Sequence, residues 1–326
     1  MRRAIALTTA LVFAAALPRT AAAQAVPIPT RAETFASPAG PEAVFDPVRT
    51  AGFTSPSPDV FEADPPWRTE VLPAGLLYRS YIANPKDARL SSRILQESGG
   101  DLLWALEAGA RVGVLRYGTP SGWRNPATGR PEGFQLDIQG AAFPRLNFDH
   151  ELDVDAVDFK VGVPLTYTEG PWEAKVGVYH LSSHVGDEFL LREPAFERLN
   201  YLRDAVVFGG GYYPDPDLRL YAEAEYAFNY DGGSRPWHVQ FGFDWVPASV
   251  NPDLHRPTPF LAANARLREE VDWGGGVNVV AGVQWRGPVS DRLFRAGVQY
   301  YNGKSWQFSF FDDHEELLGL SIWYDF

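Results

Sequence analysis

Cysteine is absent from this chain of 326 residues. Its absence excludes disulfide bonds, a thiol nucleophile, zinc–thiolate sites and a lipidated N-terminal cysteine. If the protein is exported, as its N-terminus suggests, its fold must hold in an oxidising compartment without covalent cross-links. The stability therefore has to come from packing, hydrogen bonding and the surrounding solvent.

Long apolar runs are also missing. Beyond the N-terminal region no segment approaches the roughly 20 uninterrupted apolar residues that a helix needs to cross a bilayer, so helical membrane spans are excluded. Basic residues are outnumbered, with 29 Lys and Arg against 41 Asp and Glu, and the net charge is −12. Acidity of this kind disfavours nucleic-acid binding, which requires a basic patch.

The N-terminus has the three parts of a secretory signal, and residues 1–23 are predicted to be one. Arg2 and Arg3 supply the charged start, residues 5–17 the apolar run, and residues 21–23 the small side chains of a cleavage site. The apolar run is too short to cross a bilayer as a helix. We therefore expect an exported protein.

The next segment, residues 24–69, is rich in Pro, Ala and Ser and has no sustained hydrophobic period. This composition predicts a disordered periplasmic extension. A docking segment for another component is the alternative. The folded domain is expected to occupy residues 70–326.

From residue 71 onward the chain consists of short alternating runs separated by Gly, Pro, Asp and Asn, which is typical of antiparallel strands. In the stretch 157–182, Val161 and Val163 share an apolar face with their alternate neighbours, while Asp158 and Lys160 fall on the opposite face. The same alternation assigns Asn229 to a polar face. The candidate strands are 71–82, 102–117, 132–143, 155–168, 171–182, 202–213, 217–230, 236–246, 258–268, 273–286, 291–302 and 314–326.

Two features favour a membrane barrel over a soluble sheet. The apolar faces carry Trp, Tyr or Phe towards their ends, as aromatic girdles at the two membrane interfaces do. In the last run Leu320, Ile322 and the terminal Phe326 share one face, which resembles the C-terminal strand that the outer-membrane assembly machinery reads. The sequence thus predicts an all-β, transmembrane, antiparallel up-and-down β-barrel of about 12 strands, in the outer membrane of a Gram-negative bacterium. Closure removes the sheet edges that lipid does not tolerate.

Loop lengths predict the orientation of this barrel, since periplasmic turns are short and external loops are longer. Placing Phe326 on the periplasmic side makes 169–171, 214–216 and 287–291 periplasmic turns, and makes 183–201 and 302–313 external loops. The longer segment 247–257 is the exception on the periplasmic side.

The inward positions carry charges of both signs. A barrel of this size has a narrow lumen, so such side chains can interlock as a paired polar filling that offsets their desolvation. The alternative is a narrow selective pore. Mixed signs and the absence of a single-sign ring favour the filling. The inward charges are Glu107, Arg111, Asp137, Asp158, Lys160, Lys175, Arg219, Glu223, Glu225, Asp244, Arg266, Arg268 and Arg295.

Polar residues interrupt one lipid-facing stripe near its outer end. His180, Ser182 and His184 continue the phase of Val176 and Val178, so they are expected to face the outer leaflet. Polar groups are costly in hydrocarbon unless they are paired or lie at the interface. A histidine near a serine can act as its general base when a third polar group orients the ring.

This His-x-Ser pair resembles the one in two families of outer-membrane lipid hydrolases, the phospholipase A barrels and the lipid A 3-O-deacylases. The resemblance implies ester hydrolysis on outer-leaflet lipid, with Ser182 as nucleophile and His180 as general base. The candidates for the third member are Asn200, Asp204, Asp187 and Glu188. Asn200 is preferred because the next strand begins there in a lipid-facing phase. The alternative is a set of interfacial polar residues in a non-enzymatic barrel with a transport, structural or interaction role.

Asp187 and Glu188 form a second, weaker candidate. Their carboxylates could bind Ca²⁺, which takes oxygen ligands. A solvated acidic loop is the alternative interpretation, and no other cofactor is expected.

Over residues 70–326 the chain also resembles a family of Gram-negative outer-membrane proteins known as a domain of unknown function. The matching stretches lie at 130–151, 159–192, 203–228 and 300–326, the second reading FKVGVPLTYTEGPWEAKVGVYHLSSHVGDEFLLR. This resemblance implies a barrel in the outer membrane and carries no activity. The expected partners are outer-membrane lipid and the assembly machinery.

Overall fold

The computed structural model describes residues 66–125, 128–247, 256–287 and 292–326. The predicted signal segment and the predicted extension up to residue 65 lie outside these ranges. The chain divides into two compact units, Met1–Phe61 and Glu62–Phe326. Every element described below belongs to the second unit.

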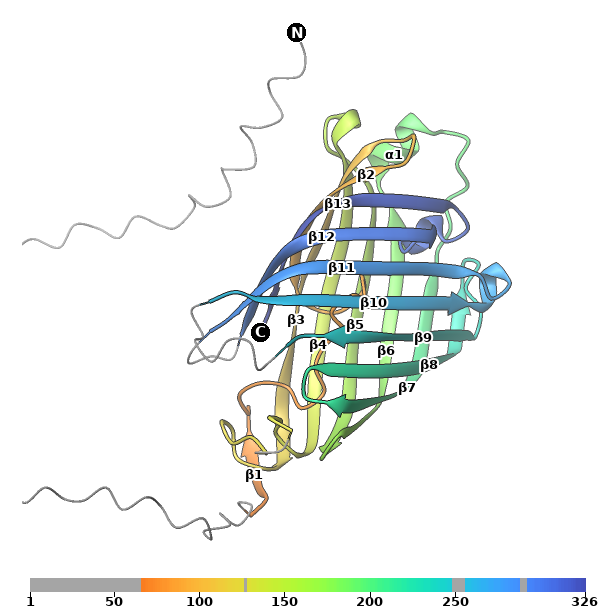
Figure 1. Ribbon diagram of the computed structural model, residues 1–326. Coiled ribbons are helices and arrows are strands. Elements are labelled where there is room, and N and C mark those ends of the chain that lie inside the picture. The colour runs from red at the N-terminus through yellow and green to blue at the C-terminus, as the bar shows by residue number, and fades with distance from the viewer. Residues whose placement is uncertain (1–65, 126–127, 248–255, 288–291) are drawn as a thin grey trace, which may run out of the picture. The chain divides into compact units, whose positions relative to one another are not determined.

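Twelve of the thirteen strands in the described residues form a closed antiparallel barrel (Figure 1). Each strand from β2 to β13 pairs with its neighbours in the chain, and β13 pairs with β2 to close the ring. This confirms the predicted all-β barrel of about twelve strands. The strands are β1 Arg68–Val71, β2 Leu90–Glu97, β3 Leu102–Gly118, β4 Gly133–Asn147, β5 Asp153–Glu169, β6 Trp172–Val185, β7 Leu202–Asp215, β8 Leu218–Asp231, β9 Trp237–Trp245, β10 Thr258–Arg268, β11 Gly275–Arg286, β12 Leu293–Lys304 and β13 His314–Asp325.

Helical structure is minor. Among the described residues one short helix, α1 (Asp187–Arg192), follows β6, and three single 3₁₀ turns cover Phe148–His150, Glu269–Val271 and Phe308–Phe310. In the part of the chain that the structure describes, no helix is both long and apolar enough to cross a membrane.

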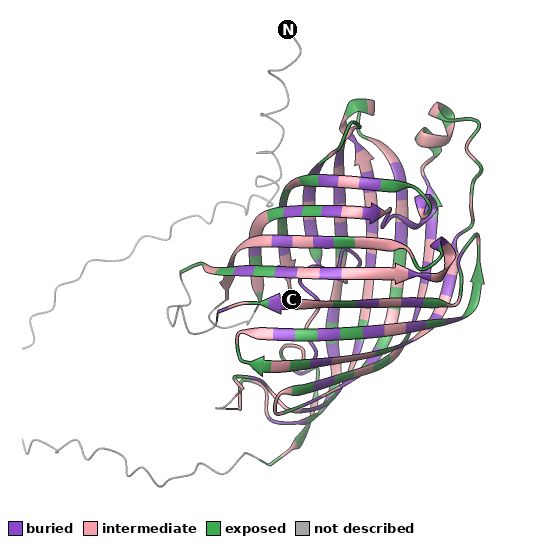
Figure 2. Cartoon of the chain, turned by 45° about the vertical axis from the view of Figure 1, so that its right-hand side comes forward, coloured by how far each residue is buried: buried purple, intermediate pink, exposed green. Residues whose placement is uncertain are grey.

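The outer face of the wall is apolar and exposed. Val161, Leu220 and Ile322 are 55%, 44% and 47% exposed, while inward neighbours such as Asp158 are buried. Figure 2 shows this alternation along the strands. A monomer in water rarely exposes a continuous apolar surface of this extent, so the outer face suits contact with lipid.

The two rims of the barrel differ in their connections. The turn rim, as we call it, carries the tight turns 170–171 and 216–217. Gly170 has a positive φ of 51° there, a conformation that glycine adopts without a steric penalty. The opposite loop rim carries residues 186–201, which include α1, and residues 305–313. This asymmetry matches the predicted difference between the two ends of the barrel.

Aromatic rings line the outside of both rims. At the turn rim Trp172 lies 4.4 Å from Tyr212, measured between ring centroids, on neighbouring strands. At the loop rim Tyr226 and Trp237 lie 4.9 Å apart in the same way. Amphipathic rings at both ends of an apolar band are the expected anchors at two membrane interfaces.

The prediction of a first strand at residues 71–82 is wrong. Val71 is the last residue of β1, which pairs with β3 but is not part of the ring, residues 72–82 form no strand, and the first wall strand is β2. The alternation pattern does not predict this strand, because some of its apolar residues face the lumen and some of its polar residues face outward. Leu95 faces inward and is fully buried, whereas Gln96 is exposed, so an alternation rule does not select it.

The chain between β1 and β2 fills the lumen, and we call residues 72–89 the inserted segment. It touches strands on all sides of the ring, which only a segment inside the barrel can do. Its wall partners are Glu107 on β3, Asp158 on β5, Glu223 on β8, Asp244 on β9, Asn278 on β11 and Asp325 on β13. Its side chains are also packed, and Tyr81 stacks on Tyr221 of the wall at 3.9 Å between ring centroids.

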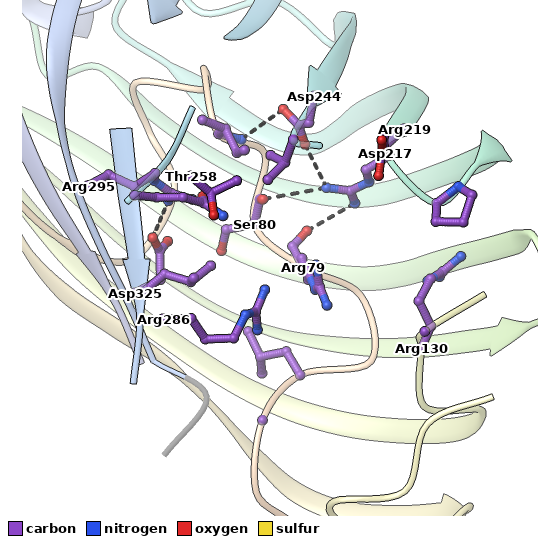
Figure 3. Close-up of a pocket in the computed structure, with 18 of the residues that line it drawn as sticks. Arg79, Ser80, Arg130, Asp217, Arg219, Asp244, Thr258, Arg286, Arg295 and Asp325 are labelled. Atoms are coloured by element: carbon purple, nitrogen blue, oxygen red, sulfur yellow. Dashed lines mark hydrogen bonds and ion pairs between the residues drawn. The ribbon is translucent and has the colours of Figure 1, made fainter. Parts of the chain in front are cut away.

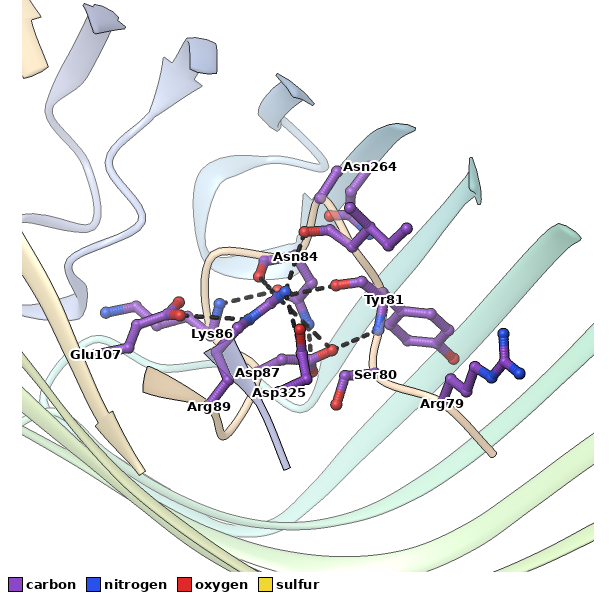
Figure 4. Close-up of polar contacts among 12 residues, drawn as sticks. Arg79, Ser80, Tyr81, Asn84, Lys86, Asp87, Arg89, Glu107, Asn264 and Asp325 are labelled. Atoms are coloured by element: carbon purple, nitrogen blue, oxygen red, sulfur yellow. Dashed lines mark hydrogen bonds and ion pairs between the residues drawn. The ribbon is translucent and has the colours of Figure 1, made fainter. Parts of the chain in front are cut away.

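Arg89 holds the inserted segment in its compact form (Figure 4). Its guanidinium donates to the backbone oxygens of Tyr81 at 2.8 Å and Asn84 at 2.7 Å. The same side chain forms an ion pair with Glu107 of the wall at 3.3 Å. Arg89 is buried, so these bonds form in a low-dielectric setting where unpaired donors are costly.

A second insertion enters from the loop rim, and we call residues 305–313 the inserted loop. Gln307 donates to the backbone oxygen of Phe143 at 2.9 Å and accepts from the Lys86 ammonium at 3.0 Å. Phe308 stacks on Tyr201 with centroids 4.8 Å apart. The two insertions therefore meet at Lys86, inside the barrel.

Most of the inward charges of the wall are paired with one another or with the insertions, and Lys160 instead lies over the Tyr179 ring, 4.8 Å from its centroid. Arg111 binds Asp137 at 2.6 Å, and Lys175 pairs with Glu223. Two of the cavities between the insertions and the wall measure about 20 Å³ each and hold no more than about one water, while a larger one opens at the turn rim. This is the paired polar filling that the mixed charges favoured over a pore.

Replacing Lys86 with methionine is expected to destabilise the folded barrel by about 3–5 kcal/mol, because it leaves a buried carboxylate uncompensated. The Lys86 ammonium lies 2.5 Å from Asp158, and both side chains are at most 2% exposed. Urea unfolding in detergent, followed by tryptophan fluorescence and gel mobility, measures the change.

The matched control is Lys304→Met at the loop rim. Lys304 also pairs with an aspartate, but the two side chains are 32% and 75% exposed. Solvent screens such pairs, so this variant is expected to change stability by less than about 1 kcal/mol. Equal losses in both variants would contradict the assigned role of Lys86.

Candidate functional site

Strand β6 carries the candidate residues on its outward face near the loop rim. His180 and Ser182 are half-buried and His184 is exposed. The intervening Leu181 and Ser183 point inward and are buried. The structure therefore places the three polar residues on the outward face of the barrel, the side on which the sequence predicts them.

The neighbours of this site on β5 are apolar. Val161 lies opposite His180, and Phe159 lies opposite Ser182 in the antiparallel register. The Phe159 and His184 rings lie 6.0 Å apart between centroids. A lipid chain that lies along this wall would thus contact apolar side chains on one side of the His-x-Ser pair.

On the other side, β7 supplies a carboxylate. Asp204 is the register partner of His180, and its Oδ1 lies 2.7 Å from His180 Nδ1. The second carboxylate oxygen of Asp204 accepts a hydrogen bond from the Asn229 amide at 2.6 Å. Because the carboxylate can only accept, Nδ1 carries the proton, and Nε2 is left as the free acceptor of the imidazole.

Ser182 lies two residues from His180 on the same face. The Cα atoms of such residues are about 7 Å apart, since a strand rises about 3.3 Å per residue. Among the described residues no hydrogen bond joins the Ser182 hydroxyl to the imidazole. Catalytic hydrogen bonds are often long in sites without substrate and tighten when it binds.

Asn200, the preferred third member, lies two residues before β7 and is exposed. Its side chain makes no hydrogen bond to the rest of the described chain. The residue that the structure brings to His180 is Asp204, one of the other candidates. The two strands decide this pairing, because the β6–β7 register sets Asp204 directly opposite His180.

Asn229 is a site residue that strict alternation misplaces. The β7–β8 register shifts between Asp204 and Ala205, so that Asn229 pairs with Asp204 and Ala227 pairs with Ala205. Phe228 is the extra residue of this bulge, which leaves both Phe228 and Asn229 exposed on the outside. The prediction that Asn229 faces inward is therefore wrong, and no sequence signal marks the bulge.

Asp187 and Glu188 are exposed in the first turn of α1. The helix is tied to β5 by Arg192, which pairs with Asp153 at 2.9 Å and with Asp155 at 2.7 Å. In the ranges that the structure describes, no three His, Cys, Asp or Glu side chains gather as a metal site. Calcium binding by Asp187 and Glu188 stays a prediction.

Comparison with known proteins identifies the family. Residues 57–326 match the family described as "Protein of unknown function (DUF1207)". The chain belongs to that family. The match spans the whole barrel and confirms the resemblance drawn from the four stretches of sequence, and the family description assigns no activity.

Several solved structures match this chain at low identity. Outer membrane phospholipase A from Escherichia coli is 11% identical, with 75% of this chain and 92% of that chain covered and a TM-score of 0.44. The Salmonella typhi outer membrane phospholipase dimer with bound calcium is 11% identical, with coverages of 76% and 93% and a TM-score of 0.44. OprD from Pseudomonas aeruginosa is 8% identical, with coverages of 78% and 97% and a TM-score of 0.30. No protein with a curated description matches the sequence.

Proposed function

We propose that this protein is an integral outer-membrane barrel that hydrolyses ester bonds of outer-leaflet lipid. The observation that carries the proposal is the 2.7 Å contact of His180 with Asp204, two residues from Ser182 on the lipid-facing wall. In the proposed orientation the turn rim faces the periplasm and the loop rim faces outward. The short turns and the longer loops support that orientation.

In this proposal Ser182 is the nucleophile. Its oxygen attacks the ester carbonyl while His180 Nε2 takes the hydroxyl proton, and Asp204 stabilises the resulting imidazolium. The ester C–O bond then breaks, and the proton passes from Nε2 to the leaving alcohol. Water hydrolyses the acyl-serine by the same proton transfers in reverse, which returns Ser182 to its starting state.

The test is hydrolysis by the purified full chain in detergent, with phospholipid and lipid A as substrates. The Ser182→Ala variant is expected to lose activity by at least about 10³-fold, because no other hydroxyl shares the His180 face of β6. Ser183→Ala is the matched control, since Ser183 points inward and bonds Ser309 at 2.6 Å. Undiminished hydrolysis by Ser182→Ala would remove the proposal.

A second candidate is a non-enzymatic barrel with a structural or interaction role. The specific observation that favours it is the lumen, which the inserted segment and the inserted loop fill. Under this candidate the bonds among His180, Asp204 and Asn229 serve to lower the cost of polar groups facing lipid. Absence of hydrolysis in the wild-type protein, together with absence of ion conductance, would favour it.

Both candidates share the same location and partners. The barrel is proposed to lie in the outer membrane of a Gram-negative bacterium, in contact with its lipid. The strand from 314 to 326 is proposed to be the segment that the assembly machinery reads. The apolar, aromatic-ended face of β13 supports this, with Leu320 the most exposed of its large hydrophobic residues at 69%.

A further inference from the structure

A cavity of about 360 Å³ opens at the turn rim (Figure 3). The His-x-Ser pair lies near the other end of the barrel, at the loop rim. The cavity lies between the inserted segment and the wall. Pockets for small ligands span about 300–1,000 Å³, so this one is large enough to hold a small molecule. Ester hydrolysis at the outer face makes no use of it.

Arginine is far more frequent among the residues that line the cavity than in the chain as a whole. Eight of its described lining residues are arginines and three are aspartates, in a chain whose net charge is −12. The arginines are Arg79, Arg111, Arg124, Arg130, Arg219, Arg256, Arg286 and Arg295. A concave site lined mainly by one sign of charge concentrates ions of the opposite sign.

Several of these arginines are held in place by acids of the wall. Such pairs fix the guanidinium groups. Arg219 spends its N–H donors on Glu173, Asp244 and the backbone oxygens of Arg79 and Ser80, whereas the other three do not use all five of theirs on the described part of the protein. The buried Nε of Arg295 in particular has no hydrogen-bond partner among the described residues. The pairs are Arg111 with Asp137, Arg130 with Glu173, Arg219 with Asp244, and Arg295 with Asp325.

Arg79 differs from these, because its side chain has no ion pair or hydrogen bond within the described chain. Its position is nevertheless set, since its backbone oxygen accepts a bond from Arg219 at 3.0 Å. Figure 3 shows Arg79 on the inserted segment, with Arg286 and Arg295 to one side and Arg130 and Arg219 to the other. A half-buried guanidinium that no acid of the described chain offsets keeps its N–H donors for an anionic ligand.

We propose that this cavity binds a phosphate-bearing anion through Arg79 and the arginines around it. The planar guanidinium matches phosphate oxygens with two parallel hydrogen bonds, and several guanidiniums can share one multiply charged group. The phosphate belongs to a small soluble molecule or to a lipid headgroup that reaches the turn rim. This site is independent of the proposed ester hydrolysis.

Titration calorimetry of the full chain in non-ionic detergent tests the proposal, with sodium pyrophosphate and a short-chain phosphatidic acid as separate probes. Saturable binding of at least one probe is expected, and it should weaken as sodium chloride rises. Arg79→Gln is expected to weaken that binding tenfold or more. The affinity of Arg79→Lys should lie between those of the wild type and Arg79→Gln, because lysine keeps the positive charge but lacks the planar guanidinium group.

The matched control is Arg198→Gln, which removes an exposed arginine from the loop rim. It should bind each probe as the wild type does. Arg79-dependent binding of pyrophosphate identifies a free anion as the ligand, whereas Arg79-dependent binding of phosphatidic acid alone identifies a headgroup. The proposal is overturned if neither probe binds, or if Arg79→Gln binds as tightly as Arg198→Gln.

Discussion

Replacing Asp204 with alanine is expected to slow ester hydrolysis by about 10²- to 10⁴-fold, the range over which a positioned acid–base group acts. Asp204 Oδ1 accepts a hydrogen bond from His180 Nδ1 at 2.7 Å. This bond leaves Nε2 free to take the Ser182 proton. Without the carboxylate the ring loses its orientation and the imidazolium loses its counter-charge. The loss should appear mainly in kcat, measured with a soluble ester and with phospholipid.

Three further variants separate the possible orienting residues. Asn200→Ala is expected to leave the rate unchanged, since its side chain does not contact His180. Asp204→Asn should retain more activity than Asp204→Ala, because an amide oxygen still accepts from Nδ1. Asn229→Ala should have a smaller effect, as Asn229 acts only through its 2.6 Å bond to Asp204. If Asn200→Ala slowed hydrolysis while Asp204→Ala kept the full wild-type rate, the residue that orients His180 would be Asn200 and not Asp204.

Opening the lumen is expected to turn a silent barrel into a conducting one. The variant replaces the inserted segment and the inserted loop with flexible Gly-Ser linkers of equal length. Removing both insertions leaves a water-accessible, charged channel through the twelve-strand ring. Single-channel recording in planar bilayers should show a steady open level for this variant and no resolved openings for the wild type.

The control replaces residues 193–200 with a linker of the same length. These residues are mostly exposed, and although the Phe196 ring lies 5.5 Å from that of Phe310, the inserted loop itself stays in place, so this variant should stay silent. A retained gel-mobility shift on heating shows that each variant is folded. Steady wild-type conductance at the level of the double variant would contradict the closed lumen.

Much of the wall follows from alternation alone. The run 258–268 is predicted with the bounds that β10 has, and most other strands are displaced by only a few residues. Alternation is a local property of the chain, because each side chain in a strand points opposite to the one before it. It succeeds where one side of the strand faces lipid and the other faces charged neighbours.

The same rule fails where packing reverses the pattern. Leu95 points inward and joins a buried cluster with Leu103, Leu317 and, from the inserted loop, Trp306. The alternation rule therefore does not predict β2. The stretch 72–89 has apolar residues like those of a strand, yet Tyr78 and Tyr81 are buried inside the lumen. Whether such a segment joins the wall or fills it depends on partners far away in the chain.

For the candidate site too, some features follow from local sequence and others do not. The phase of side chains within single strands is enough to predict a barrel with an apolar outside, a charged inside, and His180 and Ser182 on the outward face. It does not predict that Asp204 meets His180, that a bulge brings Asn229 to Asp204, or that two insertions fill the lumen and leave Arg79 in an arginine-lined cavity. These contacts join residues brought together by strand register and chain closure, and no local pattern in the sequence encodes them.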